Sequence, residues 1–297
     1  MANNGRVRQL DRKQAKQKSK KAAAKLPRIP SSFQLLRQTF SFLWQNWQVL
    51  TGIALVYSII NVIFAGNLLG SLNDSLNTIR QHQGVSNALN GYGSLLSNSS
   101  GGSQTSSVAQ SLLLIFESLV IIWAIRHLLT GQKIRVKQAY YQSMTPLVPF
   151  LLIVLVIVLQ LLPLTIGSAI LAVILSGTFG SGGALTLVFV VLAALLAAWT
   201  IYMTSASIFS IYIVTLPDMQ PRQALRSAKN LVKFRRWIIL RRLFFLPVFL
   251  LLSIGIITTL LILLVPFLVV PLFFILLMLS ILFVHTYLYC LYRGLIS

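Results

Sequence analysis

Acidic side chains are nearly absent from this sequence. Its 297 residues include only four Asp and Glu against 25 Lys and Arg, with three His and one Cys. Acid, base and nucleophilic catalysis depend on positioned carboxylates, imidazoles or thiols. The sequence also lacks paired carboxylates, a glycine-rich phosphate loop, a nucleophile elbow and a zincin histidine pair. We therefore expect a protein that is not an enzyme, with no catalytic residues and no bound cofactor.

Cysteine and histidine are equally scarce. The single Cys290 excludes a disulfide framework within the chain. His127 and His285 fall in the inner halves of apolar runs, where they could approach each other. Two histidines with no Cys or carboxylate at the same depth make a poor ligand set. No metal site is predicted.

Apolar residues dominate what is present. Hydrophobic residues make up 56% of the chain and charged residues 10%, and the mean hydropathy is +0.81, which is typical of a protein built for lipid. A helix needs about 20 apolar residues to cross a bilayer. We expect an all-α integral membrane protein with six transmembrane helices, at about 47–69, 108–130, 146–175, 184–216, 243–265 and 267–292. Only Pro266 and Pro271 mark a turn between the last two. The alternative for this run is a single long or re-entrant element, which would leave lipid-facing backbone unsatisfied unless protein covers it.

The distribution of positive charge predicts an orientation. With six spans, Arg80 is the only one of the 25 Lys and Arg residues outside one compartment, which the positive-inside rule identifies as the cytoplasm. We expect a multi-pass protein of a bacterial-type inner membrane with both termini cytoplasmic. Residues 1–30 read as a disordered basic tail, residues 31–297 as the membrane domain, and residues 70–107 as a polar outer loop.

A short pattern recurs before each pair of spans. It reads Gln34-Leu35-Leu36-Arg37, then Gln138-Ala139-Tyr140-Tyr141, then Gln223-Ala224-Leu225-Arg226. The pattern indicates three repeats of an interfacial amphipathic helix followed by a transmembrane hairpin. The alternative is chance similarity among short helices with mixed polar and apolar faces.

Basic residues cluster around the second and third of these segments. Such residues attract anionic phospholipid headgroups at about 1 kcal/mol each. The candidate headgroup-binding residues are Lys133, Arg135, Lys137, Arg222, Arg226, Lys229, Lys233, Arg235, Arg236, Arg241 and Arg242. Nucleic acid or a ribosome could meet the same charges and those of the tail, but the exposed aromatics typical of base recognition are missing. Anionic phospholipid is the preferred partner, and a protein partner or a homo-oligomer stays open.

The third segment also resembles a known family. The stretch from Leu216 to Lys233, with its Ala224-Leu225, Ser227 and Leu231-Val232-Lys233, resembles a segment of six-span bacterial membrane proteins related to the membrane domain of glycerophosphoryl diester phosphodiesterases. Residues 131–140 resemble the loop after that family's second span. The resemblance implies a six-span fold without the catalytic domain, and it carries over no catalytic residue.

Glu117 is the only acidic residue inside an apolar run. An ionisable group at that depth is costly, so it is a candidate functional residue. Asn61 and Gln160 fall at the same expected depth, and the three could form an intramembrane polar layer. Such a layer is either hydrogen-bonded glue between helices or a constriction in a transport path.

Three functions follow from these observations. The sequence favours a non-catalytic scaffold that associates with lipid or organises the cell envelope, using its basic interfacial helices to bind anionic headgroups. The alternative is a transporter or channel with a polar layer around Glu117. A second alternative is a factor for inserting or assembling membrane proteins.

Overall fold

The computed structural model describes residues 30–64, 104–179, 183–217, 219–233, 235–265 and 268–296. The basic tail, Asp218 and most of the expected outer loop lie outside these ranges. Within them, every regular element is a helix. Six of these helices form three hairpins, which are α3 (Trp47–Phe64) with α6 (Gln104–Leu129), α8 (Leu147–Phe179) with α9 (Gly183–Ile213), and α11 (Arg236–Leu264) with α12 (Val269–Ile296).

Five of the described helices are long and apolar enough to cross a membrane: α6, α8, α9, α11 and α12. The apolar stretch of α3, Trp47–Asn61, is shorter. The predicted all-helical, multi-pass class therefore agrees with the structure, in which a sixth full-length span is not present among the described residues.

Helix ends differ from the predicted span ends. α11 begins at Arg236 rather than near residue 243, so Arg241 and Arg242 lie inside a helix. α6 begins at Gln104, inside the range expected for the outer loop. Hydropathy marks where lipid begins, whereas a helix continues for as long as its backbone hydrogen bonds do, and Arg is a good helix former. The predicted division of the last apolar run into two helices is confirmed.

A short helix precedes each hairpin. These are α2 (Ser32–Gln45), α7 (Val136–Ser143) and α10 (Pro221–Val232). They begin in the same register, because the three glutamines of the sequence pattern each stand three residues after the N-cap. The N-caps are Ser31, Arg135 and Gln220, and the glutamines are Gln34, Gln138 and Gln223. In α2 the pair forms a capping box, with Gln34 N donating to Ser31 Oγ at 3.3 Å.

Burial follows the same register in all three short helices. The residue after each glutamine is fully buried, and so is the residue four positions further on. These residues are Leu35, Ala139 and Ala224, followed by Thr39, Ser143 and Ala228, each 0% exposed. Residues four apart share one face of a helix, so the recurring sequence pattern corresponds to one recurring buried face.

The short helices pack in a cyclic order. α7 packs on α6, α10 packs on α9, and α2 packs on α12. α7 and α10 therefore each lie against the second helix of the preceding hairpin, and α2 lies against the second helix of the last hairpin, which closes the cycle. The contact between α2 and α12 that completes this cycle is close, because a Cβ on Gly294 would lie 3.0 Å from Cδ of Pro30. α12 in turn contacts both α6 and α9.

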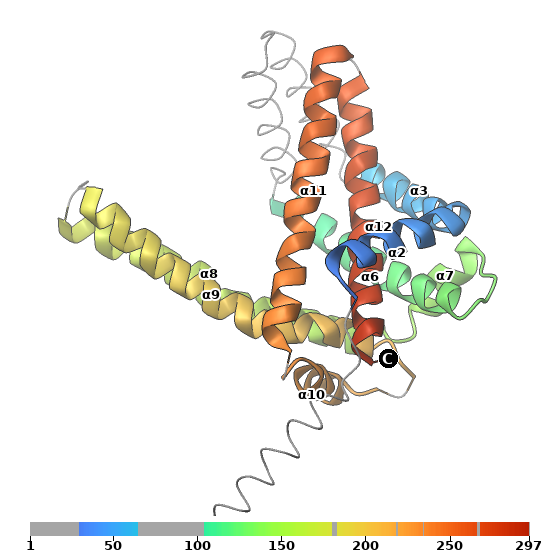
Figure 1. The fold of residues 1–297 in the computed structure, drawn as a ribbon, viewed down its shortest axis with the longest axis horizontal. Coiled ribbons are helices and arrows are strands. Elements are labelled where there is room, and N and C mark those ends of the chain that lie inside the picture. The colour runs from blue at the N-terminus through green and yellow to red at the C-terminus, as the bar shows by residue number, and fades with distance from the viewer. Residues whose placement is uncertain are drawn as a thin grey trace, which may run out of the picture.

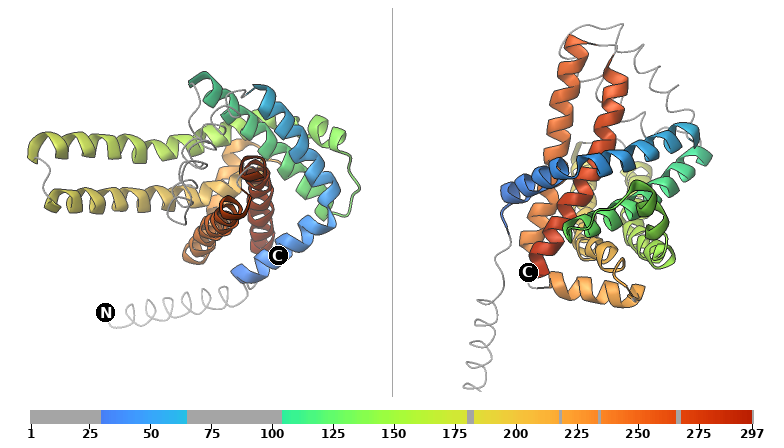
Figure 2. Two further views of the ribbon diagram at one scale, coloured as in Figure 1. Left: turned by 90° about the horizontal axis from the view of Figure 1, so that it is seen from above. Right: turned by 90° about the vertical axis from the view of Figure 1, so that its right-hand side faces the viewer.

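The three hairpins diverge from the region where the short helices pack, which we call the junction, instead of forming a parallel bundle. Figure 1 shows α8 and α9 extending in one direction while α11 and α12 extend in another. The views in Figure 2 show that α3 and α6 take a third direction. Only one end of each hairpin is therefore packed against the others, and much of α8 and α11 exposes apolar side chains.

Candidate functional site

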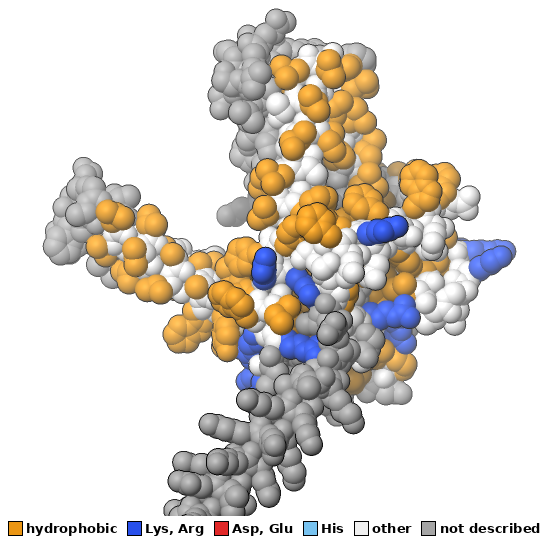
Figure 3. Space-filling model, viewed as in Figure 1, with side chains coloured by type: hydrophobic (Ala, Val, Ile, Leu, Met, Phe, Trp, Pro, Cys, Tyr) orange, Lys and Arg blue, Asp and Glu red, His pale blue; other side chains and the backbone are white. Residues whose placement is uncertain are grey.

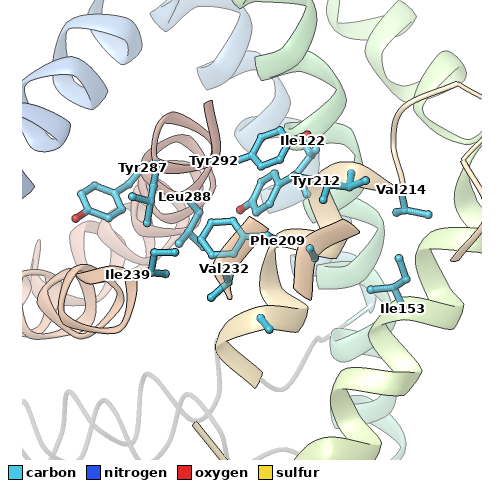
Figure 4. Close-up of a cluster of buried hydrophobic side chains, with 14 of the residues drawn as sticks. Ile122, Ile153, Phe209, Tyr212, Val214, Val232, Ile239, Tyr287, Leu288 and Tyr292 are labelled. Carbon is cyan, nitrogen blue, oxygen red and sulfur yellow. The ribbon is translucent and has the colours of Figure 1, made fainter. Parts of the chain in front are cut away.

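The centre of the molecule is a buried junction of the three second helices. Figure 4 shows Ile122 of α6, Tyr212 of α9, and Leu288 and Tyr292 of α12 gathered there. The rings of Tyr212 and Tyr292 stack with their centroids 6.2 Å apart. This packing fixes how the three hairpins meet.

A hydrogen-bonded chain crosses the same junction, with one residue from each second helix. His285 Nε2 lies 3.0 Å from Ser118 Oγ, and His285 Nδ1 lies 3.3 Å from the Tyr212 hydroxyl. Ser118 Oγ donates its own proton to the Leu114 carbonyl oxygen at 2.7 Å. Ser118 therefore accepts from Nε2–H, and Nδ1 accepts from Tyr212, which assigns the tautomer of the neutral ring.

This arrangement differs from the approach of His285 to His127 that the sequence suggested. His127 stacks on Trp123 with ring centroids 3.8 Å apart, and its Nδ1 lies 3.0 Å from the Trp123 carbonyl oxygen. Residues i and i+4 share a helix face, which explains this local pairing. Across the described ranges, no group of three or more His, Cys, Asp and Glu residues is placed to hold a metal ion.

Glu117 is bound by a residue from a short helix. The Tyr140 hydroxyl of α7 donates to Glu117 Oε2 at 2.9 Å and lies 3.1 Å from the Ile53 carbonyl oxygen of α3. Burial raises the pKa of the Tyr140 phenol, and the charge of Glu117 raises that pKa further. Tyr140 therefore stays protonated and remains a hydrogen-bond donor.

The three residues of the predicted polar layer come from two hairpins, Asn61 and Glu117 from one and Gln160 from another. Asn61 and Tyr57 are both buried in α3, and Tyr57 lies within electrostatic reach of Glu117. No hydrogen bond of the described chain joins Gln160 to this group. Gln160 belongs to α8, whose hairpin diverges from that of α3 and α6. The sequence indicates depth along the membrane normal, but it does not indicate the direction in which each hairpin leaves the junction.

Sequence reasoning also missed several partners at these positions. The repeat pattern includes Tyr140 but does not identify it as the donor to Glu117. Its signal is a hydroxyl at the repeat position where the other two copies carry Leu36 and Leu225. Ser118 and Tyr212 gave no signal, because the chain of contacts through His285 joins residues far apart in sequence.

Most of the candidate headgroup-binding residues are exposed. Exposed are Lys133, Arg135, Lys137, Arg222, Arg226, Lys229, Lys233 and Arg241, whereas Arg235, Arg236 and Arg242 are half-buried. Arg236 lies in α11 rather than on α10, and its guanidinium carbon is 4.4 Å from the centre of the Tyr202 ring in α9, a cation–π contact. Figure 3 shows Lys and Arg gathered around the junction, while hydrophobic side chains cover the parts of the hairpins that extend away from it.

Three of the hollows among the described residues are lined by arginine. One of about 630 Å³ contains Arg126 and His127, and one of about 350 Å³ contains Arg126 and Arg293. The third, of about 660 Å³, lies between α2 and α11 and contains Arg241 and Arg242. Arg126 Nη1 also donates to the Thr215 carbonyl oxygen at 2.5 Å, linking α6 to the segment after α9.

Comparisons of the chain with protein-family models, with curated proteins and with solved structures find no match. The resemblance noted around Ala224 and Leu225 therefore stays a prediction.

Proposed function

We propose that the protein is a non-catalytic, multi-pass membrane protein that gathers anionic phospholipid around its basic junction and so acts as a lipid-associating or envelope-organising scaffold. We place it in a bacterial-type inner membrane with both termini and the junction at the cytoplasmic face. The candidate headgroup-binding residues on α7 and α10 then meet the inner leaflet.

The distribution of charge carries this proposal. Glu117 is the only acidic residue in the described part of the chain, and it is buried against Tyr140. The exposed Lys and Arg of α10 face outward, while Ala224, Ala228 and Val232 are buried against the fold. A cationic surface with so few carboxylates attracts anions from outside the chain, and beside a membrane those anions are lipid headgroups.

The diverging hairpins support the same proposal. In a parallel bundle, neighbouring spans cover one another, whereas here α8 and α11 present rows of exposed apolar residues. Lipid acyl chains can cover such surfaces, including those between the hairpins. Headgroups would then bind at the junction, and the acyl chains of the same lipids would fill the space between the diverging hairpins.

Lipid selectivity measured by electron spin resonance tests the proposal. The full chain is reconstituted into bilayers containing spin-labelled phosphatidylglycerol or phosphatidylcholine, and the motionally restricted fraction of each is compared. We expect enrichment of phosphatidylglycerol that weakens with salt and falls when Arg222, Arg226, Lys229 and Lys233 are all changed to Gln. Equal restriction of the two lipids at low salt would refute the proposal.

A transporter is the second candidate, and one observation favours it. Glu117 Oε1 is buried without a hydrogen-bond partner among the described residues, and ionisable residues in membrane interiors mark ion pathways and proton relays. Flux of protons or cations into proteoliposomes, compared between the unmodified chain and Glu117→Gln, distinguishes the two functions. A scaffold gives no flux in either case.

A further inference from the structure

We propose that the hollow between α2 and α11 is a binding site for one anionic phospholipid, with the phosphate held by Arg241 and Arg242 and the acyl chains lying along Phe244 and Val248. This inference rests on the proposed function and adds to it a specific place and a stoichiometry.

The charged end of the hollow is formed by two consecutive arginines. Arg241 is exposed and Arg242 half-buried. The turn that carries them is held against the fold, since the Tyr287 hydroxyl of α12 donates to the Arg242 carbonyl oxygen at 3.4 Å. Two guanidinium groups that line one hollow suit a phosphodiester, which accepts several charge-assisted hydrogen bonds.

The start of α2 supplies the opposite rim. Ser31 and Ser32 line the hollow, and the first turn of α2 is capped within the chain, because Gln34 N donates to Ser31 Oγ at 3.3 Å. The two arginines provide the positive side-chain charge of the hollow. Phe33 and Phe245 pack with ring centroids 5.8 Å apart and join the two helices beside the hollow.

The other end of the hollow is apolar and faces outward. Phe244 is 49% and Val248 53% exposed, and they follow Arg241 by three and seven residues, which places all three on one side of α11. Trp237, 81% exposed, stands one turn before Arg241, as aromatic residues do at membrane interfaces. The order along the helix is thus aromatic, cationic, apolar.

This order distinguishes a phospholipid from a soluble phosphate. A free phosphate needs only the arginines, whereas a phospholipid also covers an apolar row that continues towards the middle of the membrane. The volume, about 660 Å³, falls in the usual range for small-molecule sites of about 300–1,000 Å³. It can hold a headgroup and the first part of its acyl chains.

Native mass spectrometry of the full chain tests the site. Detergent-purified protein is titrated with phosphatidylglycerol or with phosphatidylcholine of the same acyl chains. We expect one tightly retained phosphatidylglycerol per chain and weaker retention of phosphatidylcholine. Arg241→Gln should weaken that retention about tenfold, the loss expected for one hydrogen bond to a charged group. Val248→Trp, which fills the apolar end, should also weaken it, and excess glycerol 3-phosphate should not displace the lipid.

Matched controls separate this inference from the broader proposal. Arg37→Gln removes an exposed charge of the same kind from α2, at a residue that does not line the hollow, and should leave the retained lipid unchanged. Melting temperatures and size-exclusion profiles establish that each variant folds. Equal loss in Arg37→Gln and Arg241→Gln, no effect of Val248→Trp, or displacement by glycerol 3-phosphate would overturn the site. Lipid selectivity by spin resonance could persist in any of these cases, so failure of the site and failure of the proposed function are distinguishable.

Discussion

The hydroxyl group of Tyr140 in α7 donates a 2.9 Å hydrogen bond to Glu117 Oε2 in α6. A short helix outside the apolar spans is thereby joined to the one acidic residue that the structure describes within them. The contact holds the second repeat against the first hairpin, close to the point where Gly52 of α3 meets Val136 of α7.

Removing that hydroxyl should destabilise the protein. In Tyr140→Phe, the buried carboxyl of Glu117 loses its donor, and a buried polar group without a partner costs about 1–3 kcal/mol. We expect a lower melting temperature in detergent. Tyr141→Phe is the matched control, because the Tyr141 side chain is 74% exposed, and it should melt like the unmodified chain. Equal melting of both variants would show that the Tyr140 contact does not stabilise the fold.

The same tyrosine predicts a dependence on high pH. Burial and the charge of Glu117 raise the folded-state pKa of Tyr140 above its ordinary value of about 10. The unfolded chain releases this proton above pH 10 and the folded chain does not, so the stabilisation from Tyr140 is complete below pH 10 and declines as pH rises. Melting temperatures measured from pH 8 to 11 should fall less steeply in Tyr140→Phe than in the unmodified chain. Parallel slopes would contradict the prediction.

A close approach between the first hairpin and α7 depends on Gly52. A Cβ at this position would lie 2.8 Å from Val136 Cγ2, too close for two carbon atoms. Overpacking of this kind costs about 1–3 kcal/mol, so Gly52→Ala should lower the melting temperature. Combining it with Val136→Ala, which removes the obstructing methyl groups, should recover much of the loss. Absence of recovery would mean that Gly52 matters for another reason.

The hydrogen-bonded chain through His285 should behave as one unit. Ser118→Ala and Tyr212→Phe each remove a partner of the same imidazole, and each should cost about 1 kcal/mol. Their effects should not add in the double variant, because both act on one network. Ser205→Ala is the control, since Ser205 bonds only to the Tyr202 carbonyl oxygen of its own helix. Strict additivity of Ser118→Ala and Tyr212→Phe would indicate two independent contacts.

The orientation in the membrane can be mapped by cysteine labelling. In a Cys290→Ser background, Lys133→Cys and Arg226→Cys should react with an impermeant thiol reagent from the same side, because both residues are exposed beside the junction. We expect that side to be the cytoplasm, following the distribution of Lys and Arg. Labelling of the two positions from opposite sides would refute the predicted topology and with it the placement of the basic residues on one leaflet.

The three short helices show which features of the fold can be predicted from local sequence. The glutamine pattern predicted three equivalent short helices, and the structure gives them one N-cap register and one buried face, from Leu35 to Ala139 to Ala224. Capping and helical periodicity act over a few residues, so they can be read along the chain. The sequence also divides the last apolar run correctly into two helices. The predicted start of the first of these, near residue 243, is seven residues after the start of α11 at Arg236, because hydropathy does not indicate where a helix starts.

Composition and charge order therefore determined the class of this protein: helices apolar enough to cross a membrane, with basic segments between alternate pairs. Only the tertiary structure decided that each short helix packs on the hairpin before it, that the hairpins diverge, and that Glu117 pairs with Tyr140 while Gln160 stays apart. The physical reason is that periodicity fixes which face of a helix is apolar, whereas the partner of that face depends on the directions in which separate helices leave a common junction. Those directions arise from packing among residues as distant in the chain as Pro30 and Gly294.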